Sequence, residues 1–328
     1  MVMETALTRH AGIRYPILCG AMFPCSNPEL VAAVSQAGGL GIIQPLSLVY
    51  VHGYDYRSGL AFIRSLTTNP VGLNATVERS SKTYEERMRK WIDIGIEEGI
   101  RFFDTSLGNP KWIVEKAHQV GGVVYHKVTE RKWAEKARDA GVDGLIAVNS
   151  RAGGHAGVRD PRELFDELQD LGLPVVCGGG VGEPRQFLDA LNYGYVGVMM
   201  ATRFIASIEC TAHPDYKQAI VKATEEDIVW TERVTGVPLS VIRTDRVMNA
   251  GLKTNILIRW MLQHRHFKKA ARILLALRSM KQLKKSAMRG ATSSKDYYQA
   301  GKSVDGIKSI EAVDGIIQQF VSTGSQEL

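Results

Sequence analysis

The chain has 328 residues, of which 45% are hydrophobic and 23% are charged, and its formal net charge is +7. This composition is that of a soluble globular protein with a core large enough for one or two domains. No uncharged apolar run reaches the roughly eighteen residues of a membrane span, which excludes an integral membrane protein. The four cysteines form no CxxC pair, and the chain begins without a signal-peptide pattern, so we expect free thiols and a cytoplasmic location.

Short apolar runs rich in β-branched residues recur along the chain and predict eight strands. They lie at 16–20, 39–45, 70–77, 100–106, 122–128, 143–149, 174–180 and 195–204. Amphipathic stretches that close on glycine separate most of them, as helices do. Continuously apolar strands joined by long crossovers predict an α/β fold, a closed (β/α)8 TIM barrel. A doubly wound open sheet is the alternative, but no GxGxxG follows the first strand.

Two segments exceed a minimal barrel. Residues 46–59 carry several tyrosines and predict a long loop, which either covers a site or is an ordinary surface loop. Residues 225–300 hold much of the positive charge and show apolar residues at helical spacing, which predicts two or three basic helices at the barrel mouth. We therefore expect a barrel of residues 1–224 and 301–328, and a mainly helical C-terminal segment, residues 225–300, that acts as a substrate-binding part or lid.

One histidine stands where a barrel carries its chemistry, which is the loop after a strand. His155 follows the sixth predicted strand within NSRAGGHAG, and Gly153 and Gly154 precede it. Glycines without β-carbons allow a flat ligand to approach closely, and a histidine can accept a proton near neutral pH. The alternative is an ordinary turn histidine in a flexible loop.

Two further strand ends predict a phosphate site. Gly178, Gly179 and Gly180 end the seventh strand. Met200, Ala201 and Thr202 end the eighth. Barrels commonly hold phosphate after these two strands with backbone N–H groups and a hydroxyl, although the glycines could also serve a tight turn.

Two polar residues interrupt apolar strands. Asn74 lies in the third predicted strand and Lys127 in the fifth. A buried lysine is costly unless it faces an anion or a polar ligand, which favours a role toward a ligand. The structural alternative is a salt bridge inside the barrel with Asp104. No HExxH, GxSxG or P-loop motif is present, and no metal site is expected.

Several motifs in order resemble the nitronate monooxygenase (2-nitropropane dioxygenase) family of FMN-dependent TIM barrels, whose superfamily includes flavin-type enoyl-acyl-carrier-protein reductases. They are RYPILCGAM, NPELVAAVSQAGGLGII, PVGLNAT, VYHKV, AGGHAG, PVVCGGGV and MMATRFIASIEC. The resemblance implies FMN as the cofactor and assigns roles by position. The backbone of Gly20, Ala21 and Met22 would lie against the flavin ring. Asn74 and Lys127 would contact that ring, while Gly179, Gly180, Ala201 and Thr202 would hold the phosphate and His155 would be catalytic.

The sequence departs from the family pattern at four positions. Arg151 stands where a carboxylate is common, and a cation there would lower the pKa of His155 if its side chain points inward. Cys19 and Lys302 stand where glutamine is common, and Ala201 stands where glycine is common. These changes leave flavin binding expected and the exact reaction open.

Three functions fit these observations. The first is a nitronate monooxygenase-like oxidation of nitronates or nitroalkanes by dioxygen, with His155 as the base. The second is a reductase or dehydrogenase of acyl-CoA or acyl-carrier thioesters with NAD(P)H, for which the basic helices offer phosphate partners. The third is a flavin- or nucleic-acid-binding module without catalysis, although no aromatic pattern supports nucleic acid. We expect a small-molecule substrate and allow for a homodimer.

Overall fold

The structure is a computed structural model that describes residues 3–78, 82–255, 258, 260–261, 264–289 and 297–327. Eight parallel strands pair in chain order and close into a barrel, where Cys19 of the first strand lies opposite Met200 of the last. The strands are β1 (Ile17–Cys19), β2 (Leu40–Ile43), β3 (Val71–Val77), β4 (Phe102–Leu107), β5 (Val123–Val128), β6 (Gly144–Val148), β7 (Val175–Gly178) and β8 (Val198–Met200). Each overlaps a predicted apolar run, so the TIM barrel is confirmed and the open sheet is wrong.

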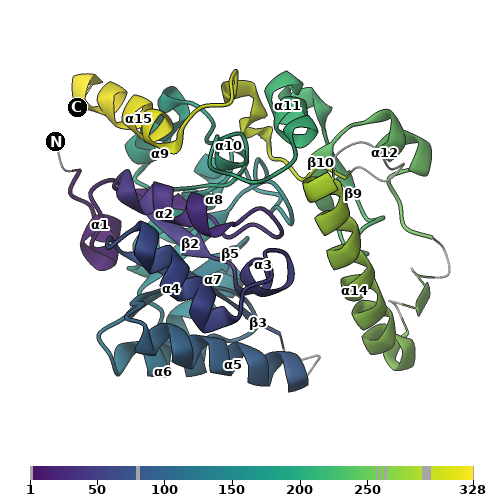
Figure 1. Ribbon diagram of the computed structural model, residues 1–328, viewed down its shortest axis with the longest axis horizontal. Coiled ribbons are helices and arrows are strands. Elements are labelled where there is room, and N and C mark those ends of the chain that lie inside the picture. The colour runs from purple at the N-terminus through teal and green to yellow at the C-terminus, as the bar shows by residue number, and fades with distance from the viewer. Residues whose placement is uncertain are drawn as a thin grey trace.

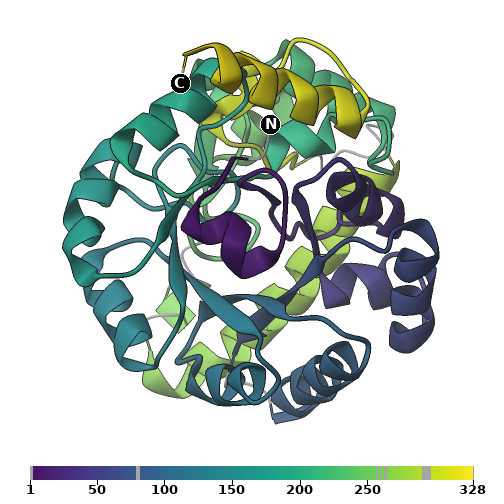
Figure 2. The same ribbon diagram turned by 90° about the vertical axis from the view of Figure 1, so that its left-hand side faces the viewer.

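Helices form a ring around the strands (Figure 2). They are α2 (Pro28–Gln36), α3 (Pro45–Tyr50), α4 (Tyr56–Leu66), α5 (Lys82–Glu97), α6 (Lys111–His118), α7 (Arg131–Asp139), α8 (Pro161–Leu168), the short 3₁₀ helix η1 (Gln169–Leu171) and α9 (Pro184–Tyr193). Four of them begin with proline, whose missing N–H costs nothing at the first helical position. Helix α8 is also capped by Asp160, which accepts from the N–H of Glu163 at 2.9 Å.

The first helix closes the amino-terminal end of the barrel. Helix α1 (Ala6–Ala11) lies across the centre of the ring, drawn in purple in Figure 2. Its fully buried Leu7 packs into the apolar interior with Leu18 and Phe102, and His10 Nδ1 lies 3.1 Å from Tyr125 Oη. A ligand therefore has the opposite, carboxyl end of the strands as its route into the barrel.

The prediction of a long loop at residues 46–59 is wrong. Most of these residues belong to α3 and to the first turn of α4, because Gln44 and Asp55 cap the two helices. The tyrosines pack on the outer helices and not over a site: the rings of Tyr50 and Tyr56 contact Trp91 of α5 at centroid distances of 6.4 and 5.5 Å. The tyrosines in residues 46–59 are therefore explained by packing between helices.

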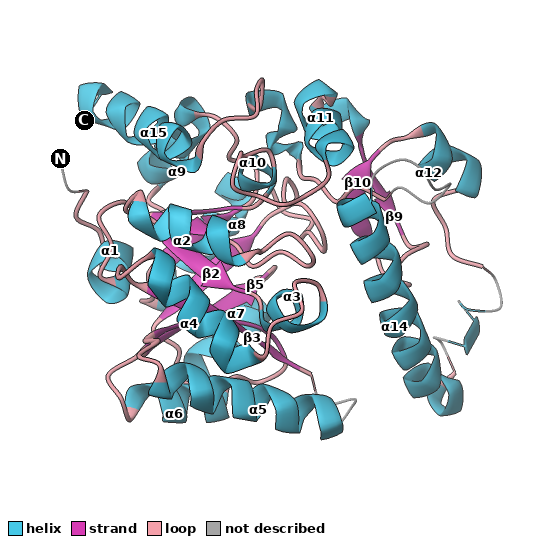
Figure 3. Ribbon diagram, in the orientation of Figure 1, coloured by secondary structure: helices cyan, strands magenta, loops and turns pink. Residues whose placement is uncertain are grey.

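The described part of residues 225–289 lies beyond the carboxyl end of the barrel, on the side away from α1 (Figures 1 and 3). It contains a two-stranded antiparallel sheet in addition to helices. Its elements, with those that precede and follow it, are α10 (Thr202–Ile205), α11 (Pro214–Lys222), η2 (Glu225–Asp227), β9 (Ile228–Thr231), β10 (Leu239–Ile242), α12 (Asp245–Ala250), α14 (Arg265–Arg289), η4 (Lys302–Gly306) and α15 (Val313–Glu327). The two strands lie within a stretch whose spacing predicted helices, and the domain boundaries at 225 and 300 stay predictions.

Helix α15 returns the chain to the outside of the barrel, where Phe320 contacts Phe187 of α9 at a centroid distance of 6.0 Å. Helix α14 contains no acidic residue in 25 positions, so this part of the chain concentrates positive charge as predicted. Among the residues that the structure describes, no helix is long and apolar enough to cross a membrane.

Candidate active site

The carboxyl end of the barrel brings together the loops after β6, β7 and β8 and a segment from near the C-terminus. The N–H of Gly301 donates to Thr202 Oγ1 at 3.1 Å, and the N–H of Lys302 donates to the carbonyl of Arg151 at 2.9 Å. These two bonds tie residues 301–302 to the loops in which the sequence predicts a phosphate site and a catalytic histidine. Lys302 contributes its backbone N–H to this contact.

Two glycines in these loops are required by close backbone contact. Gly179 has φ of 114°, and a β-carbon there would lie 2.5 Å from the Cα of Ala152. A β-carbon on Gly153 would lie 2.9 Å from the backbone nitrogen of Gly301. Such distances are far below van der Waals contact, so larger residues would push the loops apart. The glycine pattern therefore reflects packing between loops, and the contact of these glycines with a ligand stays a prediction.

The predicted phosphate site retains free hydrogen-bond donors. In the described part of the chain, the backbone N–H groups of Gly180 and Ala201 donate to no acceptor. Thr202 Oγ1 accepts one hydrogen bond from the N–H of Gly301, which leaves the threonine O–H free to donate. Arg151 lies beside this cradle, since its Nε is 3.2 Å from the position of a β-carbon on Gly180. Two free backbone N–H groups and a hydroxyl at the ends of neighbouring strands are the kinds of donor that hold a phosphate monoester.

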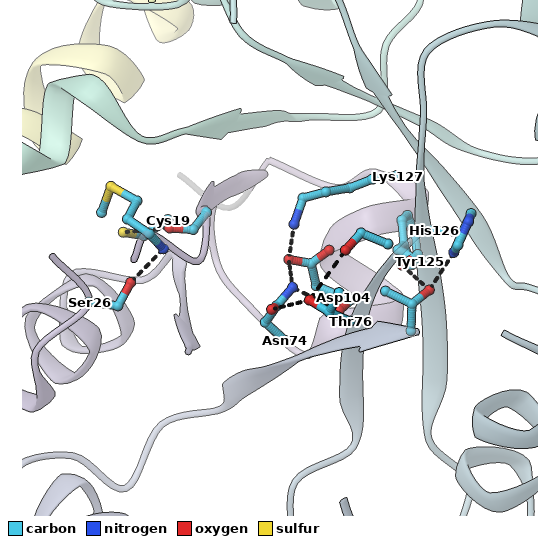
Figure 4. A network of polar contacts seen from close by, with 12 residues as sticks. Cys19, Ser26, Asn74, Thr76, Asp104, Tyr125, His126 and Lys127 are labelled. Atoms are coloured by element: carbon cyan, nitrogen blue, oxygen red, sulfur yellow. Dashed lines mark hydrogen bonds and ion pairs between the residues drawn. The ribbon is translucent and has the colours of Figure 1, made fainter. Parts of the chain in front are cut away.

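Asn74 and Lys127 meet at a buried carboxylate in the barrel. Lys127 Nζ forms an ion pair with Oδ2 of the fully buried Asp104, and Asn74 Nδ2 donates to the same oxygen at 3.2 Å. Figure 4 shows the three side chains pointing toward one another. This is the salt bridge that the sequence offered as the structural alternative.

The Asn74–Asp104–Lys127 network retains unused hydrogen-bonding capacity. Asp104 Oδ1 is buried without a partner among the described residues. Lys127 carries three donors and its side chain is 22% exposed, so at least one N–H remains for a ligand. A buried carboxylate oxygen without a protein partner is costly, so this network has capacity for one more hydrogen-bond donor. The roles of Asn74 and Lys127 toward a flavin ring stay predictions.

The turn after β1 is held by its neighbours on both sides. The N–H of Gly20 donates to the carbonyl of Met200 at 2.9 Å, and the N–H of Met22 donates to Ser26 Oγ at 2.8 Å. The carbonyl of Met22 accepts from Ser47 Oγ at 3.2 Å. Ala21, between them, is half-buried, so the turn is fixed at the end of β1, and its role against a flavin ring stays a prediction.

His155 is held by a threonine that the sequence did not single out. Its Nε2 lies 3.1 Å from Thr235 Oγ1, in the turn between β9 and β10. The threonine hydroxyl donates to the carbonyl of Val237 at 2.9 Å, so it accepts from His155 and places the imidazole proton on Nε2. Nδ1 has no hydrogen-bond partner within the described residues and carries the lone pair of a base.

The surroundings of His155 favour its neutral form. Its side chain is accessible to solvent, yet the loops around it exclude enough water to lower its pKa below the ordinary value of 6.5. Arg151 is not the cause, because its guanidinium forms an ion pair with Glu225 at 2.6 Å. An accessible histidine that is neutral at physiological pH can act as a general base without further tuning.

The β9–β10 sheet also reaches the glycine loop directly. The N–H of Ser240 donates to the carbonyl of Gly154 at 2.8 Å, one residue before His155.

A second feature missed from the sequence, besides Thr235, is Leu107 at the end of β4, which is 64% exposed and has φ of 66°. Neither Thr235 nor Leu107 stands out by residue type, so only the tertiary contacts reveal them. Within the described residues, no group of three or more potential ligands could hold a metal ion.

The model of the nitronate monooxygenase family matches residues 4–323. The chain belongs to this family. It is accordingly an oxidoreductase, and a flavin is the cofactor that membership implies; the non-catalytic alternative is wrong. A probable nitronate monooxygenase of Staphylococcus saprophyticus is 29% identical over 288 residues, covering 75% of this chain and 80% of that protein.

Relatives within and near the nitronate monooxygenase family carry other names as well. A (3aS,4S,5R,7aS)-5-hydroxy-7a-methyl-1-oxo-octahydro-1H-indene-4-carboxyl-CoA dehydrogenase of Rhodococcus jostii is 30% identical, covering 75% of this chain and 67% of that protein. The structure of FabK from Thermotoga maritima superposes with a TM-score of 0.80 and 27% identity, covering 99% of this chain and 98% of that one. A nitroalkane oxidase from Streptomyces ansochromogenes, with a TM-score of 0.76 and 18% identity over 98% of this chain and 99% of that one, shares the fold.

Proposed function

We propose that this protein is an FMN-dependent oxidoreductase of the nitronate monooxygenase type, which oxidises alkyl nitronates or nitroalkanes with dioxygen. The observation that carries the proposal is the state of His155. It is accessible, its pKa is lowered, and its Nδ1 is free while Nε2 is held by Thr235. A carbon acid activated by a nitro group needs one such neutral base and no second acid.

The site residues fit FMN. The free N–H groups of Gly180 and Ala201 and the hydroxyl of Thr202 would hold its single phosphate. Asn74 and Lys127 would contact the polar edge of the ring, which would lie against the turn at residues 20–22. When bound, the flavin supplies a two-electron acceptor that dioxygen can reoxidise.

The chain's own residues manage the proton. His155 Nδ1 would take the α-proton of a nitroalkane, and Thr235 Oγ1 would keep the ring oriented by accepting from Nε2 both before and after the transfer. A preformed nitronate has already lost this proton, so it would need the site only for binding and orientation.

Spectroscopy tests this proposal. The purified protein should be yellow, and the flavin released by denaturation should be FMN. Anaerobic mixing with an alkyl nitronate should bleach the flavin, and admission of dioxygen should restore the colour. Colourless protein that FMN does not reconstitute, or flavin that nitronates leave oxidised, would reject the proposal.

A second candidate is an oxidoreductase of acyl-CoA or acyl-carrier thioesters with NAD(P)H as reductant. It is favoured by the CoA dehydrogenase relative at 30% identity and by the basic character of α14 beside the site. The anaerobic experiment separates the two candidates, because bleaching by NADH or NADPH and not by nitronates would favour this one.

We also propose a cytoplasmic location for the enzyme. Cys19, Cys25, Cys177 and Cys210 are all free and buried. Unpaired thiols are typical of proteins that work in a reducing compartment. Fractionation of cells that produce the protein would test this assignment.

A further inference from the structure

A large open cavity lies outside the candidate active site, between α12, α14 and the turn that joins β9 to β10. Its volume is about 730 Å³. These elements stand beyond the barrel at the right of Figure 1. The described lining is mainly polar or basic and consists of Arg233, Asp245, Arg246, Asn249, Ala250, Thr254, Asn255, Ile258, Arg278, Gln282 and Tyr297. Neither the barrel nor the proposed base contributes to it.

Three arginines in this cavity form no ion pair with the residues that the structure describes. Arg246 and Arg278 have no acidic partner there. The guanidinium of Arg233 donates only to backbone carbonyls, those of Ala250 and Gly251. Several other arginines of the chain, such as Arg131 and Arg243, pair with carboxylates. Three unpaired guanidinium groups in one cavity form a strong site for an anion.

The charge of the lining exceeds what one monovalent anion would neutralise. Asp245 is the one acidic residue in the described lining, so three positive charges face one negative charge. Guanidinium groups match the paired oxygens of phosphates, and the neighbouring amides of Asn249 and Gln282 can bond to a base or a sugar. The volume is in the range of roughly 300–1,000 Å³ that small-molecule sites occupy, much more than a nitronate needs.

A residue that lines the cavity and a residue that contacts His155 are close together in the sequence. Arg233 in the cavity wall is two residues from Thr235, which contacts His155 at 3.1 Å. Two residues of extended chain span at most about 7 Å between α-carbons. Thr231, on the other side of Arg233, donates from Oγ1 to the carbonyl of Leu252 at 3.1 Å, and Leu252 lies between the lining residues Ala250 and Thr254.

We infer that this cavity binds the phosphorylated adenosine end of an extended nucleotide ligand, whose reactive end reaches the site at His155. Two sources share this chemistry: the 3′-phosphoadenosine end of a CoA thioester and the 2′-phosphoadenosine end of a phosphorylated nicotinamide dinucleotide. The use of the ligand in catalysis rests on the second candidate function, the NAD(P)H-linked or thioester oxidoreductase, whereas its binding to the arginines does not.

Calorimetric titration of the flavin-loaded protein tests the site, with 3′,5′-ADP, 2′,5′-ADP and inorganic pyrophosphate as probes. One of the two adenosine bisphosphates should bind more tightly than pyrophosphate. Preference for 3′,5′-ADP would identify the CoA source, and preference for 2′,5′-ADP the nicotinamide source. R246Q and R278Q should each raise its Kd by roughly tenfold or more.

The matched control is R185Q, which removes an exposed arginine of α9 outside the cavity and should leave the Kd unchanged. Retained flavin absorbance and thermal midpoint would show that each variant is folded. The inference is overturned if neither bisphosphate binds, if pyrophosphate binds as tightly as both, or if R246Q and R278Q bind like the wild type. Because the titration involves no turnover, flavin that NADH, NADPH and acyl thioesters all leave oxidised would reject the second candidate function and leave this site intact. Failure of nitronate oxidation would reject only the first proposal.

Discussion

The imidazole of His155 and the hydroxyl of Thr235 meet at 3.1 Å across 80 residues of sequence. This contact joins the glycine loop of the barrel to the small β9–β10 sheet. Its direction is fixed because Thr235 Oγ1 donates to the carbonyl of Val237. The appended segment therefore helps to set which nitrogen of the base is free.

Replacement of Thr235 by valine should lower kcat/KM for a nitroalkane by roughly tenfold, because one hydrogen bond that orients the base is lost. T235S should retain most of the activity, since it keeps the hydroxyl. Turnover of a preformed nitronate, which requires no proton removal, should fall much less in T235V. Equal losses with both substrates would show that Thr235 has only a structural role.

Replacement of Lys127 by methionine should lower the free energy of unfolding by about 3–5 kcal/mol, because fully buried Asp104 loses its cation. K116M is the matched control. Lys116 pairs with Asp93 at the surface, where their side chains are 35% and 47% exposed, so this pair should contribute at most about 1 kcal/mol. Urea unfolding of the two variants measures the difference, and equal values would contradict the buried pairing.

Replacement of Gly179 by alanine should both destabilise the fold and reduce the flavin bound per protein. The alanine methyl would meet Ala152, in addition to the strain of a positive φ. G121A isolates that strain, because Gly121 has φ of 69° and no atom within 4 Å of its missing β-carbon. It should cost about 1–2 kcal/mol and leave flavin content unchanged. Equal flavin content in the two variants would argue against a cradle at Gly179.

Acidification should destabilise the protein through His126. Burial and then the neighbouring charge of Lys127 lower the pKa of this histidine to about 4. Between pH 6.5 and 4 the unfolded chain binds a proton that the folded chain does not, so stability falls as the pH decreases, by up to about 3 kcal/mol. Urea unfolding as a function of pH should show a shallower decline for H126Q than for the wild type. Parallel curves would remove His126 from this effect.

The barrel could be predicted because its strands are buried on both faces. Runs such as VVCGGG and GLIAV are continuously apolar. The helix after the first ends at Gly194, and the helical stretch after the second ends at Gly172. The prediction of a loop at 46–59 was wrong because it relied on single residue types and not on helix caps. Its tyrosines pack between outer helices, and a helix that begins at a capping residue such as Asp55 resembles a loop when its polar and aromatic residues are read singly.

Most of the candidate site follows from residue types, but its connections do not. His155 and the glycines stand out because of their position after strands. Thr235, by contrast, is an ordinary residue in a hairpin turn, and its role exists only because Ser240 pairs with Gly154. The ion pair of Lys127 with Asp104 was one of the two interpretations of the sequence. Arg151 instead pairs with Glu225, so burial and not a neighbouring cation lowers the pKa of His155.

The most direct test of the account is anaerobic reduction of the bound flavin in the wild type and in H155A, with a nitroalkane and its nitronate compared. In the wild type both should bleach the flavin. In H155A the flavin should stay bound and the nitronate should still reduce it, while reduction by the nitroalkane should slow by about 10²–10⁴-fold. A variant that is reduced by the nitroalkane as fast as the wild type would contradict the assignment of His155 as the base.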